Sequence, residues 1–359
     1  MSLSKDQLVH ISSGKNHTLA LTNNGNIIAW GGLGSSRLEP SGNGLCIGQP
    51  GDNKPILLSG SIRLKTLDAG YGVNLGISQE NQVVSWGTSL IGLGGVGNAV
   101  SELTPVPIKD LPLAKFVAAG DQTFAAIDLN GKLYTWGLND NGVLGRSTSE
   151  LNAKPGLVEG LPQLKAVSIG QSFMAALSQK NQIVTWGSNS AGQLGLGHLN
   201  SEKPTVLNST HRFKNLAVGA THVIAVSEKG QVFGWGSNHL GQLGINGKPY
   251  IDQPTPIFIP EKVRSVAAGL HFSVALTESG KVYTWGWNGF GQLGLDDRSD
   301  SYQPRRVLGI SGMASVAAGE TFVTAANSHE IYGWGNNASG QMGTLASIQK
   351  TPQAFLKFS

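Results

Sequence analysis

The chain has 359 residues, and its 26 Lys and Arg stand against 22 Asp and Glu, so the formal net charge is only +4. This small excess gives no support for nucleic-acid binding, because such proteins usually concentrate basic residues on one surface. A single cysteine, Cys46, excludes an internal disulfide and any metal site built from several cysteines.

The dipeptide Trp-Gly returns seven times, at residues 30–31, 86–87, 136–137, 186–187, 235–236, 285–286 and 334–335, at intervals of 56, 50, 50, 49, 50 and 49 residues. A marker glycine keeps the same period earlier in each unit, at Gly14, Gly70, Gly120, Gly170, Gly219, Gly269 and Gly319. A period of about 50 sustained over a chain is typical of an array of equal supersecondary units. We therefore predict a single domain over residues 1–359, with repeats starting near residues 9, 65, 115, 165, 214, 264 and 314.

The segment before the first repeat has no apolar stretch of the signal-peptide type. No uncharged apolar run of 18 residues occurs, so no transmembrane span is predicted. We expect a soluble intracellular monomer, in the cytoplasm or nucleus of its own cell or of a host cell. The longest connection, residues 34–53, is rich in glycine and proline and is either a contact site or surface decoration.

The sixth repeat shows the elements of one unit most clearly. Alternating residues predict strands at 263–268, 272–277 and 282–285, and a fourth strand at 303–308. Gly269, which tolerates positive φ, is expected to help the tight turn after the first strand, and we expect positive φ at Gly280, in the hairpin after the second. Pro304 is tolerable only at a strand start or on a sheet edge.

Four short antiparallel strands per unit, repeated radially, describe a propeller blade. The sequence thus predicts an all-β, seven-bladed β-propeller of four-stranded antiparallel blades. The small residues of the first strands indicate the innermost position, and each repeated tryptophan is predicted to pack between neighbouring blades. Residues 352–356 match a fourth strand, so we expect the C-terminal strand to pair beside the first unit and close the ring.

The spaced pattern Ala-Gly-x-x-His/Phe, Ala-Leu-Thr, Gly-x-Val-Tyr-x-Trp-Gly and Asn-x-x-Gly-Gln-Leu-Gly resembles the regulator of chromosome condensation repeat. Residues 268–294 carry it in full, residues 219–244 carry it with substitutions, and the resemblance covers about residues 9–357. Members of that family include a nuclear exchange factor for the small GTPase Ran, repeat domains of ubiquitin ligases, a plant ultraviolet-B photoreceptor and bacterial proteins delivered into host cells.

The resemblance implies a protein-interaction propeller that binds a Ran- or Rab-type small GTPase or its regulators, with guanine-nucleotide exchange as one activity. The alternative is a non-catalytic scaffold of the bacterial-effector or ubiquitin-pathway type. Chromatin binding is a weaker alternative, since the chain has no basic tail. Fold alone does not choose between these functions.

In an exchange factor of this family, acidic and histidine side chains from the two positions after Ala-Gly reach the GTPase. These positions are 15–16, 71–72, 121–122, 171–172, 220–221, 270–271 and 320–321. Asp121, His271 and Glu320 have the required chemistry, although each is equally well explained as a solvated turn side chain. The partner-binding candidates are completed by Lys15, Tyr71 and Gln171. None of the fourteen residues is a tryptophan, which excludes the photoreceptor's tryptophan cluster.

Basic residues also recur five positions before the marker glycine, at Lys65, Lys115, Lys165, Lys214 and Arg264. At about 3.3 Å per strand residue, they lie about 16 Å from the turns and therefore on the opposite face. This basic arc either binds an acidic partner or phosphates, or only keeps strand ends soluble and unpaired.

Conventional catalysis has no support in the sequence. The eight histidines include no pair at metal-ligand spacing, and no Gly-x-x-x-x-Gly-Lys-Ser/Thr phosphate loop occurs. His17 and His222 share the position that follows the turn, so we interpret them as structural. We assign no catalytic residue, metal ligand or cofactor.

Overall fold

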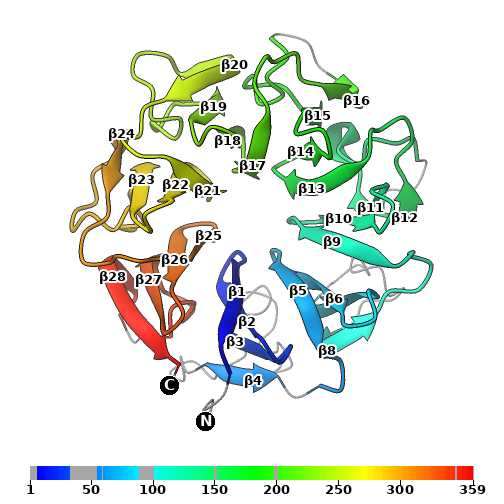
Figure 1. Ribbon diagram of the computed structural model, residues 1–359, viewed down its shortest axis with the longest axis horizontal. Helices are drawn as coiled ribbons and strands as arrows, with labels where there is room; N and C mark the ends of the chain where they lie inside the picture. Colours follow the sequence, from blue (N-terminus) through cyan, green and yellow to red (C-terminus); the bar gives the residue numbers. More distant parts are fainter. Residues whose placement is uncertain are drawn as a thin grey trace, which may run out of the picture.

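The computed structural model describes residues 6–32, 55–58, 60–88, 101–148, 152–197, 201–343 and 346–358. Within these ranges, 28 strands form seven four-stranded antiparallel sheets around one axis (Figure 1). Blade 1 contains β1–β4, and each later blade takes the next four strands of the chain. The predicted seven-bladed propeller is confirmed.

The first strand of each blade lies nearest the axis, as the small residues predicted (Figure 1). These inner strands are β1 (Leu8–Ser13), β5 (Leu64–Ala69), β9 (Ala114–Ala119), β13 (Leu164–Ile169), β17 (Phe213–Val218), β21 (Val263–Ala268) and β25 (Ser315–Ala318). The second strands are β2 (His17–Thr22), β6 (Val73–Ser78), β10 (Thr123–Asp128), β14 (Phe173–Ser178), β18 (His222–Ser227), β22 (Phe272–Thr277) and β26 (Phe322–Ala326).

The third strands are β3 (Ile27–Gly31), β7 (Val83–Thr88), β11 (Leu133–Leu138), β15 (Ile183–Gly187), β19 (Val232–Ser237), β23 (Val282–Gly286) and β27 (Glu330–Asn336). The outer strands are β4 (Ile56–Leu58), β8 (Ser101–Pro107), β12 (Asn152–Leu157), β16 (Ser201–Val206), β20 (Tyr250–Ile257), β24 (Ser301–Arg306) and β28 (Ile348–Lys357). The outer strand of blade 6 thus starts two residues before its predicted position. A 3₁₀ turn, η1 (Asp140–Gly142), follows β11.

The core lies between adjacent blades. Every residue of β22 is buried, because both faces of the blade are covered by neighbours. The seven repeated tryptophans are at most 2% exposed. Trp186 packs among side chains of blades 3 and 4, and its indole N–H donates to the carbonyl of Val143 in blade 3 at 2.8 Å. The predicted placement of the tryptophans between blades is confirmed.

The marker glycines are needed for close approach and not for positive φ. Gly269 lies outside the left-handed region, so the turn does not use its tolerance of positive φ, whereas Gly280 has φ +78° as predicted. A Cβ at Gly269 would lie 2.0 Å from the Phe272 ring and 2.7 Å from the carbonyl oxygen of Gly319. Only a residue without a side chain leaves room for the next blade at this point.

The ring closes between blades 7 and 1 through side chains. β28 hydrogen-bonds to β27 within blade 7, so the expected pairing of the last strand with the first unit is wrong. Blade 1 already has four strands of its own and offers no vacant place. The C-terminal strand nevertheless contributes to closure, since the Phe355 ring lies 5.2 Å from that of Trp30 and Phe358 is buried against blade 1.

The connection at residues 34–53, with Cys46, lies outside the described residues. Among the residues that are described, no helix is long and apolar enough to span a membrane.

Candidate functional site

The Ala-Gly turns of all seven blades meet at one mouth of the axis, on what we call the turn face. They line a depression of about 280 Å³, which includes five of the six predicted partner-binding residues: Lys15, Tyr71, Asp121, Gln171 and Glu320. Backbone hydrogen bonds join turn to turn, for example from the N–H of Leu270 to the carbonyl of Glu320 at 3.0 Å. The variable side chains therefore stand on a rigid frame.

Lys15 is the centre of a charged cluster in this depression. Its Nζ lies 3.6 Å from Glu320 Oε2 and 3.6 Å from the centroid of the Tyr71 ring. Partial burial raises the pKa of Asp121, and the positive charge of Lys15 acts in the opposite direction. Lys15 thus pairs with Glu320 and is near enough to Asp121 to affect its pKa, so the charged cluster combines residues of blades 7, 1, 2 and 3. Because the Lys15–Glu320 pair is partly exposed, it contributes at most about 1 kcal/mol.

The opposite side of the depression carries no charged turn residue. Blades 4, 5 and 6 contribute Gln171, the buried Ala220 and the half-buried Leu270. The site is therefore divided into a charged half and an uncharged half. A partner that covers the whole depression would meet both.

His271 does not share this depression with Asp121 and Glu320. It points instead toward the loop after β23, where its ring centroid lies 6.4 Å from that of Trp287, which in turn lies 5.5 Å from Phe290. Burial lowers the pKa of His271. Leu270 and His271, adjacent residues of one turn, thus face different surroundings. Sequence spacing alone could not predict which of the two lines the depression.

Trp287 and Phe290 were missed as site candidates in the sequence. The available signal was that Trp287 is the one tryptophan outside the seven-fold series. Both side chains are half-buried, and the backbone N–H of Trp287 donates to the backbone carbonyl of His271 at 3.0 Å. They place an aromatic cluster beside the turn of blade 6, and aromatic side chains are enriched in protein interfaces.

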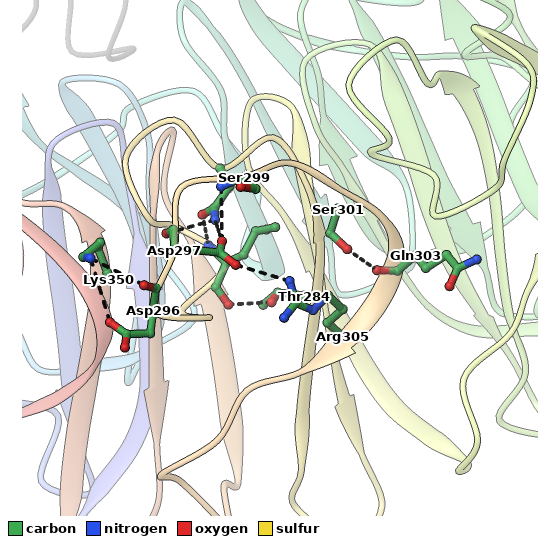
Figure 2. A network of polar contacts seen from close by, with 10 residues as sticks. Thr284, Asp296, Asp297, Ser299, Ser301, Gln303, Arg305 and Lys350 are labelled. Atoms are coloured by element: carbon green, nitrogen blue, oxygen red, sulfur yellow. Dashed lines mark hydrogen bonds and ion pairs between the residues drawn. The ribbon is translucent and has the colours of Figure 1, made fainter.

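A polar network supports the loop that carries this aromatic cluster (Figure 2). The carboxylate of Asp297 accepts from Asn288 Nδ2 at 2.9 Å and from the Ser299 N–H at 3.1 Å, and it lies 3.4 Å from Arg305 Nη1. Lys350 of blade 7 approaches Asp296. These contacts tie the loop both to its own blade and to the next.

The basic arc lies at the other end of the inner strands, on what we call the hairpin face, since its side chains contact the hairpins that follow the second strands. Lys65 Nζ donates to Asn81 at 2.8 Å, Lys115 Nζ to the carbonyl of Leu129 at 3.4 Å, and Lys165 contacts Asn181. Lys214 and Arg264 both contact Glu278. Each basic group is thus bonded to a nearby hairpin, which favours the solubilising interpretation of the arc over a shared anion site.

The two histidines interpreted as structural bridge adjacent blades. His17 Nε2 lies 2.7 Å from Asn74 Oδ1, and His222 Nε2 lies 3.0 Å from Ser273 Oγ. Burial lowers the pKa of His17 to about 4 and that of His222 to about 3. Over the described ranges, no group of three or more His, Cys, Asp or Glu is arranged to hold a metal ion.

Seven four-stranded blades in a ring, with variable side chains gathered at one mouth of the axis, define the chain as a β-propeller. Its sequence identifies the branch of that class. Residues 91–358 match the model of the RCC1-like domain, and residues 8–35 match that of the regulator of chromosome condensation (RCC1) repeat. The chain belongs to the RCC1-like family.

Two curated relatives match part of the chain. The probable E3 ubiquitin-protein ligase HERC6 of Homo sapiens is 31% identical over 123 residues, which cover 32% of this chain and 11% of that protein. The ultraviolet-B receptor UVR8 of Arabidopsis thaliana is 31% identical over 133 residues, 36% of this chain and 29% of the receptor. The chain therefore spans less than a third of the length of either relative.

Among solved structures, that of Prp20p from Saccharomyces cerevisiae, reported with its binding properties to Gsp1p and histones, has a TM-score of 0.76 to this chain. It is 23% identical, and the match covers 89% of this chain and 82% of that one. At this identity the likeness concerns the fold.

Proposed function

We propose that this propeller is a protein-interaction module that binds a Ran- or Rab-type small GTPase, or a regulator of one, through the turn face. The observation that carries the proposal is the gathering of five variable side chains, including Asp121 and Glu320, around one depression on a rigid ring. Variable side chains on a fixed scaffold are where binding specificity commonly resides. The likeness in fold to Prp20p, with its reported binding to Gsp1p, supports this choice of partner.

Exchange of guanine nucleotide is the activity that two acids at this position would serve. A carboxylate can compete with the nucleotide for the bound Mg²⁺, which prefers carboxylate and phosphate oxygens. Asp121 and Glu320 lie in one depression, and Lys15 must release Glu320 before that carboxylate can bind a metal. We propose further that the protein acts as a monomer in the cytoplasm or nucleus, of its own cell or of a host cell.

The second candidate is a non-catalytic scaffold, of the ubiquitin-pathway or bacterial-effector type. The uncharged half of the depression and the pairing of Lys15 with Glu320 favour it, because both reduce the acidic surface available for exchange. In that case the turn face binds a protein without releasing its nucleotide.

The test is release of a fluorescent guanine nucleotide from a panel of Ran- and Rab-type GTPases, with binding measured in parallel. We expect Asp121→Ala and Glu320→Ala to weaken binding or exchange, and His271→Ala to weaken binding through its aromatic neighbours. The double change Lys115→Ala with Lys165→Ala, on the hairpin face, is the matched control. Binding without release supports the scaffold. If no GTPase in the panel binds, the GTPase proposal fails, and loss of binding only in the lysine variant means that the working face is the other one.

A further inference from the structure

A second hollow lies on the hairpin face at blade 5, which we call the blade-5 groove. It has a volume of about 580 Å³ and is lined by residues 229–232, which follow β18, and by residues 256–262, which form the end of β20 and its connection to β21. The groove is therefore separate from the turn face, at the other end of the strands.

The floor of the groove is apolar, and its outermost side chain has no structural role in the blade. Phe258 is 83% exposed, more than any other large hydrophobic side chain in the described ranges. It follows the buried Ile257, and the residues that follow the equivalent buried position in blades 2, 3 and 4 are the exposed polar Lys109, Glu159 and Asn208. The fold thus accepts a polar residue at this position, and an aromatic one exposes apolar area that a partner would cover.

The groove is also electropositive. Lys229 and Lys262 line it, and neither makes an ion pair within the described residues. Its one acid, Glu261, is already neutralised, because Lys281 Nζ lies 2.6 Å from Glu261 Oε1. That hydrogen bond holds the pKa of Glu261 below its usual range. Two free ammonium groups therefore flank an apolar floor.

We propose that the blade-5 groove binds an extended peptide segment of a partner protein that carries one large apolar side chain flanked by acidic residues. The apolar side chain packs on Phe258, and the acids pair with Lys229 and Lys262. Buried aromatic anchors with charged groups at the rim are the usual arrangement of an interaction hot spot. Binding by side chains is favoured over strand addition, since Pro254 and Pro256 interrupt the donors of the β20 edge.

The test uses the full chain, immobilised, to select binders from a displayed library of random 12-residue peptides. We expect enriched peptides with a large apolar residue next to Asp or Glu. Their affinity, measured by fluorescence anisotropy with a synthetic copy, should fall about tenfold in Phe258→Ser and by a similar factor in Lys229→Glu with Lys262→Glu. The matched control is Leu308→Ser, which changes the equivalent residue of blade 6, itself 70% exposed.

Circular dichroism and the melting temperature verify that each variant is folded. We expect Phe258→Ser to fold, because the Phe258 side chain is exposed. The proposal is overturned if no enriched peptide depends on Phe258, or if the enriched peptides are basic or lack acids. It is also overturned if phosphatidylserine vesicles, and no peptide, bind in a Phe258-dependent manner, because the groove then serves a membrane surface. Variants of the turn face that lose GTPase binding should still bind the selected peptides, so the two proposals are tested separately.

Discussion

The carboxylate of Asp68 accepts a hydrogen bond from the backbone N–H of Ala119 at 2.8 Å, which ties the inner strand of blade 2 to that of blade 3. Its other oxygen accepts from Ser12 Oγ of blade 1 at 2.9 Å. One side chain thus connects three consecutive blades at the wall of the axis. Burial raises the pKa of this carboxyl to about 6.

The first prediction follows from that pKa. A folded-state pKa above the ordinary 3.8 means that the folded protein holds this proton more firmly than the unfolded chain. The favourable contribution of Asp68 is therefore present below pH 3.8 and is lost as pH rises to about 6, by up to about 3 kcal/mol. Asp68→Asn should remove this pH dependence and leave stability at pH 7 equal or higher. Denaturant unfolding at pH 4.5 and pH 7 measures it, and an unchanged slope with pH would contradict the assignment.

The second prediction has the opposite sign. His222 has a folded pKa lowered from 6.5 to about 3, so the unfolded chain takes up the proton first as pH falls. Its contribution to stability is present above pH 6.5 and decreases below it, by about 2 kcal/mol at pH 5. His222→Phe should reduce the acid sensitivity by that amount, because phenylalanine occupies the equivalent position in blades 4, 6 and 7. Denaturant unfolding of His222→Phe and of the parent at pH 5 and pH 7 measures the difference, and an equal loss of stability in both proteins would contradict the assignment.

A third prediction concerns the tryptophan series. Trp186→Ala removes a fully buried ring and its hydrogen bond to Val143, so we expect a loss of about 3–5 kcal/mol in the free energy of unfolding. The half-buried Trp287, changed to Ala, should cost much less. Urea unfolding of both variants compares them directly. A Trp186→Ala protein within about 1 kcal/mol of the parent would place that ring outside the core.

The fourth prediction concerns ring closure. Deletion of residues 351–359 removes Phe355 and Phe358 from the contact with blade 1 and exposes Trp30. We expect the melting temperature to fall by several degrees, or the protein to aggregate through the freed edge. Phe355→Ala should reproduce part of this loss without shortening the chain, whereas Phe258→Ser should not change the melting temperature. If the deletion melts like the parent, blades 7 and 1 are held together by other contacts.

The propeller was predictable because the same local sequence pattern occurs seven times. The strands predicted in one repeat can therefore be checked against those of the other repeats. The alternation in residues 263–268 and the place of Trp285 required no knowledge of distant contacts. By contrast, the role of Gly269 depends on the carbonyl of Gly319 in the next blade, and the pairing of β28 depends on whether blade 1 is complete. Neither is encoded within one repeat.

The site was predictable to a similar extent. Lys15, Tyr71, Asp121 and Glu320 come together because their turns occupy equivalent places around an axis, which the period alone implies. His271 was grouped with them by position, and its separation arises from the Trp287 loop, whose path is particular to blade 6. No sequence motif predicted the blade-5 groove, because a hollow forms where the surrounding side chains leave space unfilled.

Every sheet of this ring is made of consecutive strands, and Leu8 and Phe358 pack in the same cluster between blades 7 and 1. No blade therefore combines strands from both ends of the polypeptide. A gene rearranged so that the chain opens between two other blades would leave all seven sheets intact. The contacts between blades thus specify the order of the blades around the axis. They do not specify which blade comes first along the chain.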